Sequence, residues 1–109
     1  MERVYNKLVR DKIPEIIKSK GERPIVKELY FSEYKLALEK KLNEECQEVI
    51  GASGTERVEE IADVLEVLRA LAKLEGFSLK QVISVADEKN AKRGAFEKRI
   101  FLEKVISDK

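Results

Sequence analysis

The fold of this chain is constrained most by two long stretches with helical periodicity, residues 32–50 and 55–75. Apolar side chains recur in both at spacings of three and four, as in amphipathic helices. Ser32 and Thr55 stand at the starts of the two stretches, where side chains that cap a helix belong. Only the turn at residues 51–54 separates them. So short a connection makes the helices antiparallel neighbours, and the sequence therefore predicts a helical hairpin.

The flanking segments complete the expected architecture. Pro14 suits the first turn of a short helix. Ser78, followed three residues later by a glutamine, forms a capping box for a third long helix. Residues 25–30 and 96–105 are rich enough in apolar residues to be expected as a small β-hairpin. The predicted fold class is mainly α, a single domain over residues 1–109 built from two long antiparallel helices and a third.

The composition limits the chemistry that this fold could carry. The 22 Lys and Arg residues balance 21 Asp and Glu residues, which argues against a nucleic-acid binder. The chain has no histidine and one cysteine, which excludes a Ser-His-Asp triad and zinc sites built on His or several Cys. The apolar runs are too short for a membrane span or a signal peptide. With a single cysteine, we expect a cytoplasmic protein that binds neither membrane nor nucleic acid.

Glutamates interrupt the apolar stripe of the first long helix. At 100° per residue, Glu45 lies about 20° from Leu38, in the middle of that stripe. Glu48 lies on its edge at about 80°, and Glu44 lies further out at about 120°. An unpaired charge inside an apolar stripe is costly, so a compensating partner is expected.

The second long helix repeats this signal. Glu60 and Asp63 share one face, three residues apart, within the apolar girth of the helix. In an antiparallel hairpin they come to similar heights as Glu45 and Glu48, so four carboxylates are expected to converge. Their mutual repulsion favours a hard divalent cation with oxygen ligands, Mg²⁺ first and Mn²⁺ as the alternative. The competing explanation is that these carboxylates are ordinary solvated charges. Against it, a carboxylate pair interrupts the apolar face of both helices, on the two sides of one short turn.

The third long helix carries a complementary group of side chains. Lys89, Asn90 and Arg93 continue its apolar stripe towards the C-terminal end. Cations near a metal cluster suit a polyphosphate ligand. Cations at a helix C-terminus are also favoured by the helix dipole, so a purely structural role stays open.

These residues resemble a known family. Residues 44–48 and 60–63, EECQE and EIAD, resemble the EExxE…ExxD signature of the all-α nucleoside triphosphate pyrophosphohydrolase superfamily, which includes MazG. The opening YNKLVRDKIPEII, residues 5–17, and the ending KNAKRGAFEKRIFLEKV, residues 89–105, resemble a MazG-like branch. That branch is predicted to consist of house-cleaning pyrophosphatases that act on noncanonical nucleotides.

The resemblance implies a role for each candidate residue. Its Mg²⁺ ligands match Glu45, Glu48, Glu60 and Asp63. Catalysis is expected from Glu44, Glu45 and Glu48, with Glu44 as the extra acid of the motif. Substrate binding is expected from Lys89, Asn90 and Arg93. Further candidates for phosphate contacts are Lys7, Arg10 and Lys12, for which a solvated basic loop is an equal alternative.

The function implied by the resemblance is Mg²⁺-dependent hydrolysis of a nucleoside triphosphate, expected to be noncanonical, to a monophosphate and pyrophosphate. A homodimer or homotetramer is expected, because the second helix is apolar over more of its girth than its neighbours within one chain can cover. Two alternatives remain. One is a non-catalytic helical protein-interaction module, and the other is a metabolic enzyme that resembles phosphoribosyl-ATP pyrophosphohydrolase.

Overall fold

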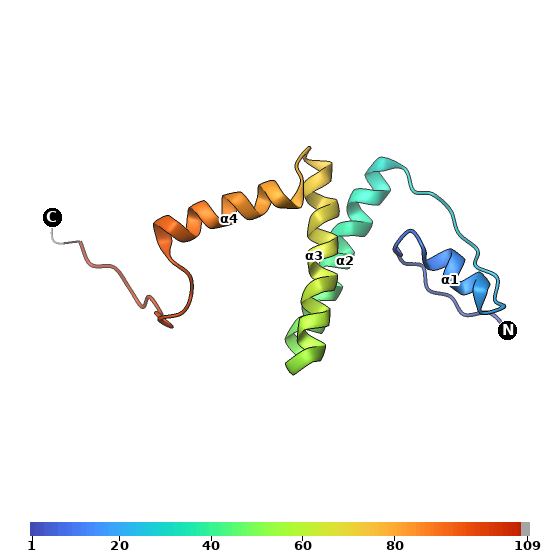
Figure 1. The fold of residues 1–109 in the computed structure, drawn as a ribbon, viewed down its shortest axis with the longest axis horizontal. Coiled ribbons are helices and arrows are strands. Elements are labelled where there is room, and N and C mark those ends of the chain that lie inside the picture. The colour runs from blue at the N-terminus through green and yellow to red at the C-terminus, as the bar shows by residue number, and fades with distance from the viewer. Residues whose placement is uncertain (108–109) are drawn as a thin grey trace.

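The computed structural model describes residues 1–107 and is mainly helical, as the sequence predicts (Figure 1). Helices α2 and α3 form the antiparallel hairpin, joined by a two-residue connection. Helix α4 packs against α3 alone, and among residues 1–107 helix α1 packs against no other helix. None of the helices in this range combines the length and apolarity needed to cross a bilayer. The four helices are α1 (Ile13–Ser19), α2 (Phe31–Gly51), α3 (Gly54–Leu74) and α4 (Leu79–Arg93).

The ends of the helices follow from local capping chemistry. Ser78 and Gln81 make the predicted reciprocal bonds: the Gln81 N–H donates to Ser78 Oγ at 3.2 Å, and the Ser78 N–H donates to Gln81 Oε1 at 2.8 Å. Gly76 follows α3 with a φ of +86°, a conformation that suits glycine after a helix. Helix α2 begins one residue before Ser32, because the Glu33 carboxylate accepts the Tyr30 N–H at 3.2 Å.

The predicted β-hairpin is wrong for the residues that the structure describes. Residues 25–30 and 96–105 contain no strand. They lie at opposite ends of a molecule that is 68 Å long, so neither can supply the other's backbone hydrogen bonds (Figure 1). A strand without a neighbour leaves its N–H and C=O groups to water. Residues 25–30 stay unpaired, and the second segment begins with a turn in which the Arg99 N–H donates to the Phe96 carbonyl at 3.2 Å.

A single chain is unusually open. Its accessible surface is 10516 Å², whereas a folded monomer of 12.5 kDa exposes about 6,200 Å². The radius of gyration is 19.1 Å, against about 13 Å for a compact chain of this length. Among residues 1–107 only Leu38 and Val67, where α2 meets α3, are fully buried, at 3% and 5% exposure. One chain therefore lacks the core that a stable domain needs.

Helix α3 has a second apolar face. Val58, Ile61, Leu65 and Leu68 follow one another at spacings of three, four and three, and they are 39% to 65% exposed. At 100° per residue this stripe lies on the side of α3 opposite Val67, away from α2. Alternating spacings of three and four are typical of a helix that packs along another helix. Helices α2 and α4 both pack against α3, yet these four side chains stay at least 39% exposed in the single chain.

Candidate metal centre

Three of the predicted ligands converge between α2 and α3. Glu45 on α2 and Glu60 and Asp63 on α3 each offer a carboxylate oxygen, and these oxygens lie within 4.8 Å of one another. The hairpin explains the convergence, because Glu45 shares a face with Leu38, while Glu60 and Asp63 share a face with Val67. The three side chains are half-buried at the edge of the small core.

The fourth predicted ligand, Glu48, is exposed and lies beside Glu60. The pKa of Glu60 is raised, first by a hydrogen bond with Glu48 that requires a proton on one of the two carboxyl groups. Desolvation and the charges of Glu48, Asp63 and Glu45 raise this pKa further. Glu45, Glu48, Glu60 and Asp63 therefore interact electrostatically as one group, which we call the carboxylate cluster.

Two oxygens of the carboxylate cluster lack a partner. Glu45 Oε2 and Glu60 Oε2 are buried, and neither accepts a hydrogen bond from the part of the chain that the structure describes. A buried carboxylate oxygen without a partner is costly. Oxygen donors gathered in this way suit a hard cation such as Mg²⁺ or Mn²⁺. The residues present therefore fit the expected metal ion.

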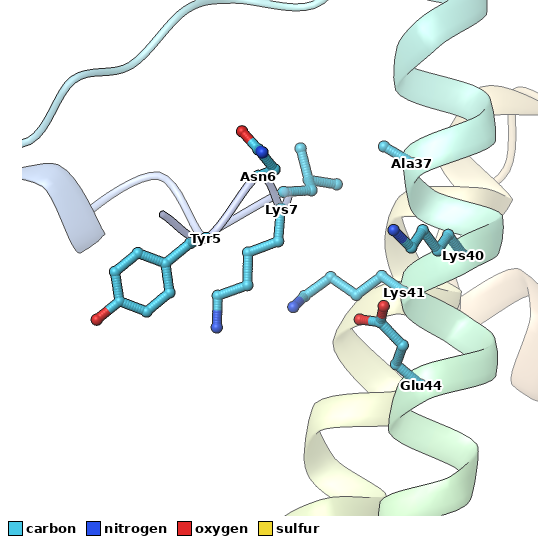
Figure 2. A pocket seen from close by; sticks show the side chains of 8 residues that line it. Tyr5, Asn6, Lys7, Ala37, Lys40, Lys41 and Glu44 are labelled. Carbon is cyan, nitrogen blue, oxygen red and sulfur yellow. The ribbon is translucent and has the colours of Figure 1, made fainter. Parts of the chain in front are cut away.

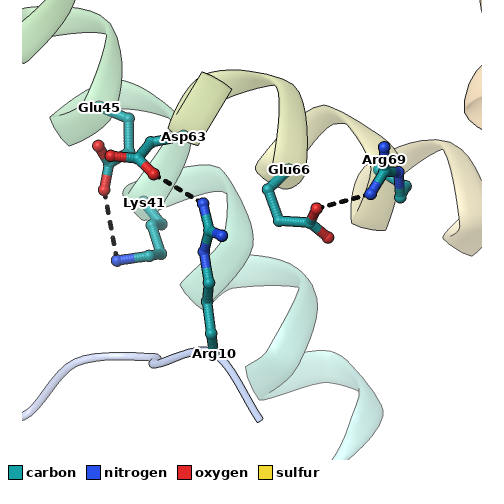
Figure 3. Close-up of polar contacts among 6 residues, drawn as sticks. All are labelled: Arg10, Lys41, Glu45, Asp63, Glu66 and Arg69. Carbon is teal, nitrogen blue, oxygen red and sulfur yellow. Dashed lines mark hydrogen bonds and ion pairs between the residues drawn. The ribbon is translucent and has the colours of Figure 1, made fainter. Parts of the chain in front are cut away.

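Two cations of the protein partly neutralise the carboxylate cluster (Figure 3). Arg10 Nη2 lies 2.6 Å from Asp63 Oδ1, and Lys41 Nζ lies 3.5 Å from Glu45 Oε1. Arg10 was expected to contact phosphate, but in the single chain it pairs with a carboxylate. Lys41 was not predicted from the sequence. Its position four residues before Glu45 on one helix is the signal that could have identified it.

A pocket of about 150 Å³ lies beside the carboxylate cluster, between the N-terminal segment and α2 (Figure 2). It brings Lys7 together with Lys40 and Lys41, so three lysine side chains line one small space. Lys7 also lies over the ring of Tyr5, 5.3 Å from its centroid. The pocket is lined by Tyr5, Asn6, Lys7, Leu8, Ala37, Lys40, Lys41 and Glu44.

Two of the other predicted residues lie outside the carboxylate cluster. Glu44 is exposed on α2 and lines the lysine pocket, where its carboxylate faces Lys41 (Figure 2). Lys12 is exposed at the start of α1. Because Glu44 borders the pocket and directly precedes Glu45 on α2, its carboxylate is available there to a proton or a lysine.

Within one chain, α4 does not bring its polar residues to the carboxylate cluster. Lys89, Asn90 and Arg93 are exposed near the C-terminal end of α4. This helix runs away from the hairpin (Figure 1), and it packs against α3 but not against α2. Any contact between these residues and the carboxylate cluster must therefore come from a second copy of the chain or from a different position of α4.

Comparisons with known proteins add little to this picture. No family model and no solved structure matches the chain. A segment of 45 residues is 47% identical to part of an uncharacterized protein of Mycolicibacterium smegmatis. The match covers 41% of this chain and 46% of that protein, so the chain spans less than half of its relative. These similarities assign the chain to no family.

Proposed function

We propose that the protein is a Mg²⁺-dependent hydrolase that converts a nucleoside triphosphate, expected to be noncanonical, to a monophosphate and pyrophosphate. The observation that carries the proposal is the carboxylate cluster. It combines oxygens within 4.8 Å of one another with two buried oxygens that lack a hydrogen-bond partner. The adjacent pocket with three lysines suits the anionic chain of a triphosphate.

The proposed reaction divides among residues that lie close together. Glu45, Glu48, Glu60 and Asp63 would hold Mg²⁺, which when bound supplies Lewis-acid neutralisation of the phosphate oxygens. The lysines of the pocket bind the triphosphate through their ammonium groups.

The remaining step is attack by water on the α-phosphorus. A bond forms between the water oxygen and this phosphorus, and the bond to the oxygen that bridges the α- and β-phosphates breaks, releasing pyrophosphate. Glu48 is exposed at the edge of the carboxylate cluster, so its carboxylate oxygen is available to accept the proton of that water. Glu44, which borders the pocket, is the second candidate for this role.

The active form in this proposal is a homodimer or homotetramer. Three features of the single chain support it: the apolar stripe of Val58, Ile61, Leu65 and Leu68, the excess surface of about 4,300 Å², and the exposed α4. Two chains together carry about 8,600 Å² of this excess, and obligate homodimers bury 2,000 to more than 5,000 Å² in total, so the excess is large enough to supply such an interface. In such an assembly the exposed Lys89, Asn90 and Arg93 of one copy are available to the carboxylate cluster of another.

The decisive assay measures pyrophosphate release from a panel of triphosphates. The full chain is incubated with standard, deaminated, oxidised and methylated nucleoside triphosphates and with phosphoribosyl-ATP, each with Mg²⁺, with Mn²⁺ and with EDTA. We expect pyrophosphate from at least one modified nucleotide, with either cation and not with EDTA. Turnover of phosphoribosyl-ATP alone would support the metabolic alternative. No pyrophosphate from any substrate would refute the enzymatic proposal.

The same open architecture favours a second candidate, a non-catalytic module that binds another protein through helices. The observation behind it is the exposed apolar surface of the C-terminal segment, where Phe96, Phe101 and Val105 are 80% to 97% exposed. Large exposed apolar patches mark interaction surfaces. This candidate predicts that the carboxylate cluster can be neutralised without loss of function, whereas the enzymatic proposal predicts complete loss.

A further inference from the structure

A long-range ion pair joins the N-terminal segment to the carboxylate cluster. The Arg10 guanidinium donates a hydrogen bond to Asp63 Oδ1 at 2.6 Å, across 53 positions of sequence (Figure 3). Arg10 lies outside any helix, before α1 begins at Ile13. It therefore reaches α3 from a segment that can move without unwinding the hairpin.

Asp63 cannot give its full negative charge to two cations at once. A divalent cation held by Glu45, Glu60 and Asp63 would take up the charge that Arg10 neutralises in the chain alone. Lys41 differs, because it lies on the same helix as Glu45 and pairs with it at the longer distance of 3.5 Å.

From this geometry we propose that Arg10 is an internal competitor of the divalent cation and weakens metal binding in the absence of substrate. The inference rests on the proposed metal site and adds a regulator to it. The Arg10 and Asp63 side chains are 55% and 45% exposed, so water screens the pair and a metal ion can displace it. The displaced guanidinium is then free to bind a phosphate oxygen, which couples metal binding to triphosphate binding.

The test measures Mn²⁺ binding to the full chain by calorimetry, without nucleotide. The variant is Arg10→Gln, which removes the charge and keeps a side chain of similar length. The matched control is Arg3→Gln, because Arg3 forms an equally exposed ion pair with Glu22 in the same N-terminal segment. We expect Arg10→Gln to lower the dissociation constant by about two- to fivefold, the strength typical of an exposed ion pair. Arg3→Gln should leave it unchanged.

Each outcome decides between the inference and the proposal beneath it. If Arg10→Gln binds Mn²⁺ more tightly than the wild type and Arg3→Gln does not, the competitor role is supported. The same holds if Arg10→Gln binds measurably and the wild type binds too weakly to measure. Equal binding in the wild type and Arg10→Gln overturns the inference and leaves the metal site standing. An equal gain in Arg3→Gln overturns it as well, because net charge then explains the effect. Absence of binding in all three proteins overturns both the inference and the metal site.

Discussion

The apolar stripe of Val58, Ile61, Leu65 and Leu68 on α3 makes self-association directly testable. Leu65 lies within this stripe and is 39% exposed in the single chain. We expect Leu65→Asp to abolish the oligomer. Since one chain fully buries only two residues in the part that the structure describes, the variant should also lose much of its stability.

The size of the effect follows from exposure. Leu65 is 39% exposed in the single chain, and full burial of a leucine contributes about 1.5–3 kcal/mol. Covering the exposed part therefore contributes about 0.6–1.2 kcal/mol, which counts twice, about 1–2 kcal/mol, in a symmetric dimer. The aspartate also places an unpaired carboxylate in each half of the interface, at a cost of several kcal/mol. A total above about 4 kcal/mol weakens association by about a thousandfold or more.

Sedimentation velocity from about 1 to about 100 µM measures the assembly, and urea unfolding at both ends of this range measures its stability. The wild type should sediment as a dimer or larger and unfold at higher urea when concentrated. The control Glu59→Asp adds an aspartate to an exposed position of α3 and should behave like the wild type. A monomeric wild type whose urea midpoint equals that of Leu65→Asp would refute the reasoning.

The remaining predictions concern the carboxylate cluster and its substrate. Glu48→Gln and Asp63→Asn should each abolish pyrophosphate release with unchanged helical circular dichroism, whereas Glu59→Gln should retain it. Arg93→Ala should lower kcat/KM by about a hundredfold without a change in Tm, since its side chain is exposed on α4. Mg²⁺ or Mn²⁺ at a hundredfold excess over Kd should add about 2.7 kcal/mol, raising Tm by roughly 10 °C, and EDTA should reverse the gain. The pKa of Glu60 is raised above its ordinary 4.5, so the folded metal-free chain binds more protons than the unfolded chain. Unfolding curves should therefore show stability falling as pH rises from 4.5 through the raised pKa, and Glu60→Gln should remove this fall.

Local periodicity was enough to predict the two hairpin helices and the convergence of three of the carboxylates. The bounds of α2 and α3 agree with the expected ranges within one or two residues, because helical spacing acts over a few positions. The predicted caps Ser32 and Thr55 are wrong, because both lie inside the helices and the capping positions are Tyr30 and Ser53. The same spacing placed Glu45, Glu60 and Asp63 on facing sides of the hairpin. Once the connection had to be short, their convergence followed from helix geometry alone.

What the sequence did not reveal depends on contacts between distant segments. The alternation in residues 25–30 and 96–105 does not say whether a partner strand lies nearby, and among residues 1–107 none does. The direction of α4 depends on the connection after α3 and on packing, neither of which periodicity encodes. Arg10 and Asp63 are 53 positions apart in the sequence, so no local pattern predicts their ion pair.

The two faces of α3 link assembly to chemistry. One face carries Glu60 and Asp63 towards α2, and the opposite face carries the apolar stripe that includes Leu65. The hairpin alone buries little apolar surface. We therefore expect most of the folding stability that holds the carboxylates in place to come from the second copy that covers the stripe. Loss of the partner should consequently loosen the carboxylate cluster and weaken metal binding, even though no residue of the stripe touches the metal. Measuring Mn²⁺ affinity of the wild type above and below its dissociation concentration tests this coupling. Equal affinity at both concentrations would show that the hairpin holds its carboxylates without help.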